Sequence, residues 1–209
     1  MNLADRWSQT WNDLALENPD PQLLQALLKR YSEPHRAYHT PRHLEECFAE
    51  FDGVRTLCVY PGDVQLALWF HDAIYDTKAS DNEAKSASWA ETVLATANAP
   101  LDQRHRIRDF ISATKHDVLA STPDACLVVD IDLSILGSES ERFDEYERQV
   151  RFEYSWVTEA AFRGGRRAIL NQFLERPAIY STAHFRNRLE KRARANLERS
   201  LARLGASEG

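Results

Sequence analysis

The 209-residue sequence is poor in the residues that shape β-hairpins and disulfide frameworks. It has only 7 glycines and no turn pair between two stretches of alternating apolar residues, which is the usual hairpin signal. Its 3 cysteines form no close-spaced pair, and an odd number of them points to free thiols in a reducing compartment. Nowhere do apolar residues approach the roughly 18 in succession that a membrane span needs. The first residues also lack a basic segment followed by an apolar run, so we expect a cytoplasmic protein outside the membrane.

An excess of positive charge is missing as well. The chain has 26 Lys and Arg against 32 Asp and Glu, a formal net charge of −6. It is therefore a poor candidate for binding a nucleic acid polymer, although a locally positive pocket can still hold a small anionic substrate. The one basic segment, residues 186–199, is expected to be a solvated helix face, and its amphipathic pattern is compatible with a homodimer.

Apolar residues recur at helical spacing through most of the chain. Leu3, Trp7, Trp11 and Leu14 share one face of a helix, for example. The same pattern, interrupted by polar or proline-containing breaks, predicts helices over residues 3–14, 21–31, 41–51, 64–75, 82–97, 103–116, 140–156, 158–175 and 181–203.

Several of these helices begin with residues that favour a helix start. Asp20, Thr40, Asp63 and Asp102 are expected N-caps, Pro21 and Pro41 suit the first helical position, and Ser80 with Glu83 has the spacing of a capping box.

One apolar segment, residues 125–133, is too short for its periodicity to separate a strand from a helical turn. No repeat, low-complexity tract or linker divides the sequence. The pattern as a whole predicts an all-α, single-domain helical bundle of about nine helices, with a core over about residues 20–175 and a C-terminal helix over about residues 181–203.

The stretch LALWFHDAIYD, residues 66–76, places His71 and Asp72 inside an apolar helical pattern. Burying such a pair without compensation is costly. A helix-cap role is disfavoured, because the apolar pattern continues to Ile74 and Tyr75. A salt bridge or hydrogen bond within the core, or a bound cation, remains as the explanation.

Other ligand-type residues interrupt apolar segments elsewhere. His43 follows the expected helix start in YHTPRHL, and Asp132 lies in VVDIDLSILG with Asp130 two residues before it. One divalent cation between two imidazoles and two carboxylates accounts for His43, His71, Asp72 and Asp132 together. This mixed donor set suits Mn²⁺, Fe²⁺, Co²⁺ or Zn²⁺, and on an octahedral ion it leaves about two positions for water or substrate.

With these motifs, the sequence resembles the HD-domain superfamily of metal-dependent phosphohydrolases, whose mark is a His, an adjacent His-Asp and a late Asp on a helical bundle. The segments RAYHTPRHL, LALWFHDAIYD, DNEAKSA, VDIDLSILG, FEYSWV and GRRAILNQFLERPAIY resemble one bacterial branch of predicted HD phosphohydrolases, over about residues 5–200. The resemblance implies metal ligation by His43, His71, Asp72 and Asp132, with Asp130 as the alternative last ligand. It implies one divalent ion (Mn, Fe, Co, Zn or Mg, with Mn favoured), and a second metal stays open.

The same resemblance implies hydrolysis of a small phosphate ester or anhydride, such as a nucleotide, by metal-activated water. Beside this enzyme stand two alternatives, a non-catalytic module of HD fold that binds metal or nucleotide, and a structural bundle with buried ion pairs. Catalytic roles are expected for Asp72, His116 and Glu83, and contacts with the substrate for Arg36, His39 and Lys115. The alternative for Glu83 is a helix-capping role. The alternative for Arg36, His39 and Lys115 is an exposed position in a loop.

Overall fold

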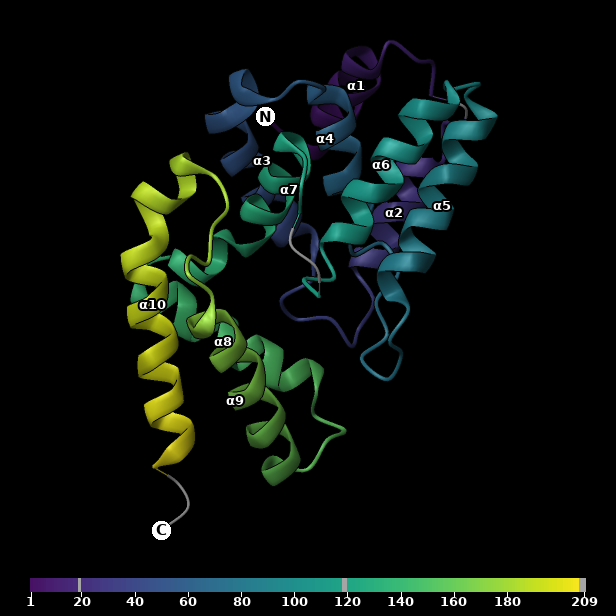
Figure 1. Cartoon of the computed structure of the whole chain (residues 1–209). Helices are drawn as coiled ribbons and strands as arrows, with labels where there is room; N and C mark the ends of the chain where they lie inside the picture. The colour runs from purple at the N-terminus through teal and green to yellow at the C-terminus, as the bar shows by residue number, and fades with distance from the viewer. Residues whose placement is uncertain (19, 118–119, 207–209) are drawn as a thin grey trace. The chain divides into compact units, whose positions relative to one another are not determined.

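The computed structural model describes residues 1–18, 20–117 and 120–206, and all regular elements in these ranges are helical (Figure 1). This confirms the predicted all-α fold. The α-helices are α1 (Leu3–Leu14), α2 (Leu23–Tyr31), α3 (Pro41–Val54), α4 (Pro61–Phe70), α5 (Asn82–Thr96), α6 (Leu101–Ala113), α7 (Pro123–Asp132), α8 (Ser140–Glu153), α9 (Glu159–Glu175) and α10 (Ala183–Gly205). Two 3₁₀ turns, η1 (Arg55–Leu57) and η2 (Leu133–Gly137), follow α3 and α7.

Packing divides the chain into two compact units, Met1–Asp132 and Leu133–Gly209. The first contains α1 to α7 and the second contains η2 and α8 to α10. All four predicted metal ligands therefore belong to the first unit. That the whole chain forms a single domain stays a prediction.

Helix α4 is the centre of the first unit. All residues from Gly62 to Phe70 are buried, and the helix packs against α1, α3, α5, α6 and α7. From Leu66 to Phe70 the helix is apolar on all sides, and such a helix needs a buried position because no face of it is suited to water. The segment that carries the His-Asp pair is thus fixed by neighbours on every side.

The predicted extent of this helix, residues 64–75, is wrong at both ends. Helix α4 begins at Pro61 and ends at Phe70, and His71 occupies the C-cap position. Beyond Phe70, backbone carbonyls bind side chains instead of helical N–H groups: the Arg36 guanidinium donates to the carbonyls of Asp72 (2.7 Å) and Ala73 (3.2 Å). The sequence disfavoured a helix-end position for His71 and Asp72, and this expectation is wrong: the pair lies at the end of α4.

The predicted helix start at Thr40 and Pro41 is confirmed, with Thr40 as the N-cap residue and Pro41 in the first turn of α3. The start at Asp20 is wrong, because α2 begins at Leu23. The Asp20 carboxylate instead accepts the backbone N–H of Gln22 at 2.8 Å, in the turn before the helix.

Three other capping predictions are wrong, because prolines or neighbouring residues start the helices elsewhere. Helix α4 starts at Pro61, which leaves Asp63 in the first turn, and α6 starts after Pro100, which does the same for Asp102. Helix α5 has Asp81 as its N-cap residue, so Ser80 and Glu83 form no capping box. Acidic groups in a first turn still interact favourably with the helix dipole.

The undecided segment, residues 125–133, is helical. It forms most of α7, which begins at Pro123, and the chain continues into η2. Pro at the first position is typical of helix starts, and it lies just outside the apolar run that was ambiguous on its own. This segment raises the number of α-helices in the described ranges from the expected nine to ten.

In the second unit, α10 packs against α9 and η2. The Asn196 side chain donates to the carbonyls of Leu136 (2.9 Å) and Ser138 (3.0 Å), and the Tyr180 hydroxyl donates to the Leu133 carbonyl (3.1 Å). These bonds attach η2 and the residue after it to α10 and to the segment that precedes α10. Across the described ranges, no helix combines the length and the apolar composition that a bilayer crossing requires.

Gly62 allows α4 to approach the end of α1, and a larger residue should not fit. A Cβ atom there would lie 2.6–2.7 Å from backbone atoms of Asp13 and Leu14. We expect Gly62→Ala to lower the free energy of unfolding by about 1–3 kcal/mol, the usual cost of overpacking. Thermal and urea unfolding measure this.

Gly53→Ala is the matched control. Gly53 lies in α3, and a Cβ atom there meets no other atom within 4 Å. The same substitution should leave stability unchanged or raise it by up to about 1 kcal/mol, because Ala is the better helix former. Equal effects of the two substitutions would contradict the close packing of α4 on α1.

Candidate metal centre

Three helices that pack on one another bring the predicted metal ligands together. His43 is the third residue of α3, His71 and Asp72 follow the last residue of α4, and Asp132 is the last residue of α7. Each of the three helices packs against the other two. As a result, one ligand atom from each of the four side chains lies within 4.8 Å of all the others, an arrangement that can hold a metal ion.

The imidazole nitrogens form the centre of this cluster. His43 Nε2 and His71 Nε2 are 3.0 Å apart. Asp72 Oδ2 lies 3.0 Å from His71 Nε2 and 3.5 Å from His43 Nε2. Asp132 Oδ1 lies 3.5 Å and 3.4 Å from the same two nitrogens.

A hydrogen bond on the side of the ring away from the cluster fixes the orientation of His71. Its Nδ1 lies 2.8 Å from the carbonyl of Leu68. Because a carbonyl only accepts, Nδ1 carries a proton and donates it, and in the neutral ring Nε2 then presents a lone pair to the cluster. Metal-binding histidines have this arrangement, with the second ring nitrogen donating to a backbone carbonyl or a carboxylate.

The cluster is closed on one side and accessible on the other. The side chains of His43 and His71 are 2% and 1% exposed, whereas those of Asp72 and Asp132 are 18% and 16% exposed. Water can therefore reach the cluster at the two carboxylates, whereas the two imidazoles are closed to it. A metal site that admits water in this way is compatible with a catalytic role.

His39 and His116 lie beside the two carboxylates. His39 Nε2 is 4.0 Å from Asp72 Oδ2, and its ring packs on Tyr75 with 4.1 Å between centroids. His116 Nε2 donates to Asp132 Oδ2 at 3.0 Å. His116 also has a positive φ of 61°, a conformation uncommon outside glycine, which is often found at functional sites.

Arg36 lies in the loop before α3, as predicted, but it is buried there and not exposed to water. Its side chain is fully covered, and besides the carbonyls of Asp72 and Ala73 its guanidinium binds the carboxylate of Glu33 and the carbonyl of His39. The structure thus shows Arg36 holding the turn after α4. Its predicted contact with a substrate stays a prediction.

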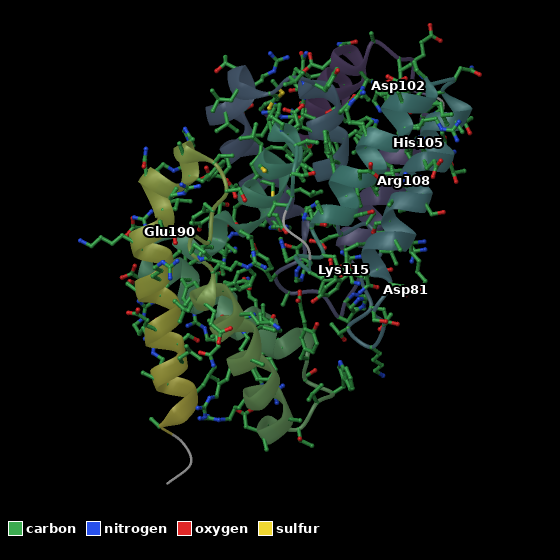
Figure 2. All side chains as sticks on the ribbon, in the orientation of Figure 1. Asp81, Asp102, His105, Arg108, Lys115 and Glu190 are labelled. Carbon is green, nitrogen blue, oxygen red and sulfur yellow. The ribbon has the colours of Figure 1, made fainter. Side chains whose placement is uncertain are left out.

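Of the remaining expected residues, none joins the group of four in the described part of the chain. Lys115, labelled in Figure 2, lies just past α6 and is half-exposed. It forms an ion pair with Asp117 at 2.8 Å. That hydrogen bond raises the pKa of Lys115, and the charge of Glu83, in the first turn of α5, adds a smaller effect in the same direction. Asp130, the alternative last ligand, is fully buried in α7 outside the cluster.

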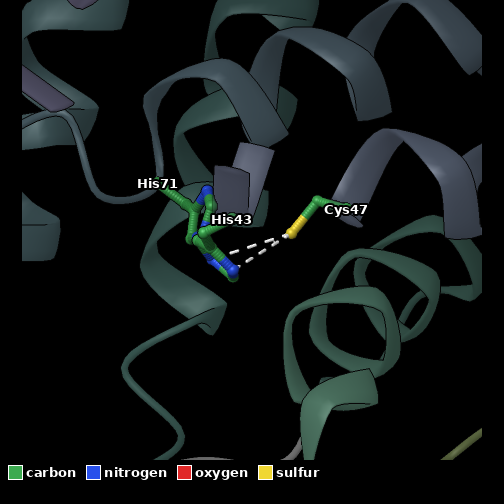
Figure 3. Close-up of side chains that lie close together, drawn as sticks. All are labelled: His43, Cys47 and His71. Carbon is green, nitrogen blue, oxygen red and sulfur yellow. Dashed lines mark hydrogen bonds between the residues drawn. The ribbon is translucent and has the colours of Figure 1, made fainter. Parts of the chain in front are cut away.

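The sequence analysis missed Cys47, one helical turn after His43 in α3. Its sulfur lies 3.6 Å from His43 Nε2 and 3.7 Å from His43 Nδ1, and it forms a second group of possible ligands with both imidazoles (Figure 3). The spacing of four residues between His43 and Cys47 was the available signal, because residues four apart share one face of a helix.

Opposite charges hold the cluster together in the absence of a metal. Burial alone would raise the pKa of Asp72, but the positive charges of His71 and then His39 hold that pKa well below its usual range. Burial likewise acts against the hydrogen bonds from His116, His43 and His71, which hold the pKa of Asp132 well below its usual range. Burial would lower the pKa of His71, but the charge of Asp72 raises it well above its usual range.

The chain matches no protein-family model, no curated protein and no solved structure in comparisons with each. The molecule itself is an all-α protein with a buried cluster of His, Cys and Asp that can hold a metal ion. These two features are compatible with a fold of the HD type.

The pKa shifts predict opposite pH dependences for stability and for metal binding. Lowered carboxylate pKa values stabilise the fold above about pH 4, and raised imidazole pKa values stabilise it below about pH 6.5 and lose this effect as the pH rises through them. Metal binding requires neutral imidazoles. From about pH 6 to about pH 8, the metal-free protein should lose stability while its affinity for Mn²⁺ rises.

Thermal unfolding with a chelator present and titration calorimetry with Mn²⁺ measure the two trends. Calorimetry in buffers of different protonation enthalpy should also detect protons released on binding. His71→Ala is the control: it should lack the Mn²⁺ trend and keep only the part of the stability trend that comes from the raised pKa of His43. A Mn²⁺ affinity that does not change with pH would contradict ligation by imidazoles that are protonated in the free protein.

Arg36→Lys should disturb the turn that carries Asp72. A lysine cannot fork between two carbonyls, so at least one buried carbonyl loses its partner, at a cost of about 1–3 kcal/mol. We expect lower stability together with weaker Mn²⁺ binding. Arg42→Lys is the control, because Arg42 pairs with Glu46 on the half-exposed face of α3 and should change stability by less than about 1 kcal/mol.

Proposed function

We propose that this chain is a metal-dependent phosphohydrolase of the HD type that acts on a small phosphate ester or anhydride, for example a nucleotide. The observation that carries the proposal is the convergence of His43 Nε2, His71 Nε2 and the carboxylates of Asp72 and Asp132 on one point. The resemblance of the sequence motifs to the HD superfamily supports the reaction class.

The donor set fits a divalent ion. Two imidazoles and two carboxylates suit Mn²⁺ and its neighbours, and both His71 and Asp132 are held in place by a further hydrogen bond. When bound, such an ion supplies Lewis acidity, which activates water and polarises a phosphoryl oxygen.

The remaining roles fall to residues beside the carboxylates. Asp132 holds the Nε2–H of His116, and we assign His116 the protonation of the leaving oxygen, with the proton coming from Nδ1 of the imidazolium. His39, next to Asp72 on the accessible side, is placed to donate a hydrogen bond to the phosphoryl group. Lys115 and Glu83 keep their expected roles in substrate binding and water activation as part of the proposal.

Metal analysis of the purified protein tests the foundation of this proposal. Elemental mass spectrometry should find near one divalent metal ion per chain after incubation with Mn²⁺, and His71→Ala should lose it. His105→Ala is the matched control, because His105 lies on α6 outside the cluster. A wild-type protein that stays empty would refute the metal centre and favour the structural bundle.

A screen for phosphate release with Mn²⁺ then separates an enzyme from a binding module. Turnover that stops with a chelator supports the phosphohydrolase. Bound metal without turnover of any phosphate ester or anhydride in a broad panel would favour the non-catalytic module.

His116→Asn tests the proton donor on an active substrate. Asparagine tolerates the positive φ of this position and removes the titrating ring, so the fold should be kept. We expect kcat to fall by about 10²–10⁴-fold, the typical contribution of a general acid or base. His105→Asn should keep kcat near the wild-type value. A smaller fall in kcat with a substrate whose leaving group needs no proton would identify protonation of the leaving oxygen as the step that His116 serves.

A further inference from the structure

Cys47 differs from the other two cysteines in what its thiol faces. Cys58 Sγ donates to the Val54 carbonyl at 3.7 Å, and Cys126 Sγ donates to the Ala120 carbonyl at 3.4 Å. Cys47 Sγ instead lies against the nitrogens of His43 and is almost fully buried. It is the cysteine that lies among groups able to share an ion with it.

The Cys47 sulfur is within hydrogen-bonding distance of His43, 3.6 Å from Nε2 and 3.7 Å from Nδ1 (Figure 3). A rotation of the Cys47 side chain would let its thiolate share an ion with Nε2 of His43, because Zn–N and Zn–S bonds of about 2.0–2.1 Å and 2.3 Å place nitrogen and sulfur roughly 3.3–3.8 Å apart.

We infer that His43, Cys47 and His71 form a second donor set, which binds thiophilic ions such as Cd²⁺ or Zn²⁺ and overlaps the oxygen-containing set. All three side chains are buried, and one ligand atom of each lies within 4.8 Å of the others (Figure 3). A shared ion requires side-chain rotation, and Cys47 has a single side-chain torsion to adjust.

The overlap has a functional consequence. Both sets use His43 and His71, so an ion in one set excludes an ion from the other. A hard ion such as Mn²⁺ prefers the carboxylates of Asp72 and Asp132, whereas a thiophilic ion prefers the thiolate. On the proposed function, thiophilic ions therefore displace the working metal and stop turnover, so the site distinguishes between metals.

Cd²⁺ and Mn²⁺ titrations of the full chain test this inference. Cys47→Ser should weaken Cd²⁺ binding by more than about tenfold, at least the loss that an outer partner of a metal ligand causes. Mn²⁺ affinity should stay within about twofold of wild type. Cys126→Ser is the matched control and should alter neither affinity, and circular dichroism establishes that each variant is folded.

A spectroscopic measurement on the wild type needs no variant. The Cd²⁺ complex should show a sulfur-to-cadmium charge-transfer band in the ultraviolet, which should be absent when Cys47→Ser or Cys47→Ala is loaded with Cd²⁺. A wild-type Cd²⁺ complex without this band, or a Cd²⁺ affinity equal in wild type and Cys47→Ser, would overturn the inference.

The outcomes also separate this inference from the proposed function. Cd²⁺ binding that depends on Cys47 in a protein without Mn²⁺ affinity would support the second donor set and refute the proposed function. Mn²⁺ binding and turnover with no effect of Cys47→Ser on Cd²⁺ would do the reverse.

Discussion

The buried end of α4 is the constraint on which the first unit depends. A helix end leaves backbone carbonyls without helical partners, and in a dry interior each of them needs a donor. The carbonyl of Leu68 accepts a hydrogen bond from the His71 ring, and that of Trp69 accepts one from the Tyr31 hydroxyl. The Arg36 guanidinium donates to the carbonyls of Asp72 and Ala73. The hydrogen bonds that allow α4 to end inside the core therefore also aim His71 and Asp72 at His43.

The sequence predicts which segments are helical better than it predicts where each helix begins and ends. Apolar spacing is a local property, and it identified nine helical segments correctly. The end of α4 depends on Tyr31 and Arg36, which reach it from distant parts of the chain, so the apolar run through Tyr75 wrongly suggested a longer helix. Prolines at 61, 100 and 123 set other helix starts more strongly than the neighbouring acidic residues did.

The convergence of the candidate ligands was predictable because their chemistry is out of place in apolar segments. His43, His71, Asp72 and Asp132 each need a partner there, and the structure provides it in one another. The same reasoning did not single out Cys47, because a free cysteine behaves as a small apolar residue and is commonly buried in a core without a polar partner. The packing of α3 on α4 determines which face of α3 turns toward His71. Residue spacing within α3 does not reveal this tertiary contact.

The metal-free cluster is a strained arrangement of ion pairs. The raised pKa values of both imidazoles favour protonation of both rings, and with His71 Nδ1 donating to Leu68 this places two like charges at the Nε2 atoms, 3.0 Å apart. With a single proton between them, two carboxylates share one imidazolium, and the cluster keeps an excess negative charge that is costly to bury. A divalent cation between neutral imidazoles balances both carboxylates. The exposed edges of the two carboxylates also leave room for an exchangeable ligand on such an ion.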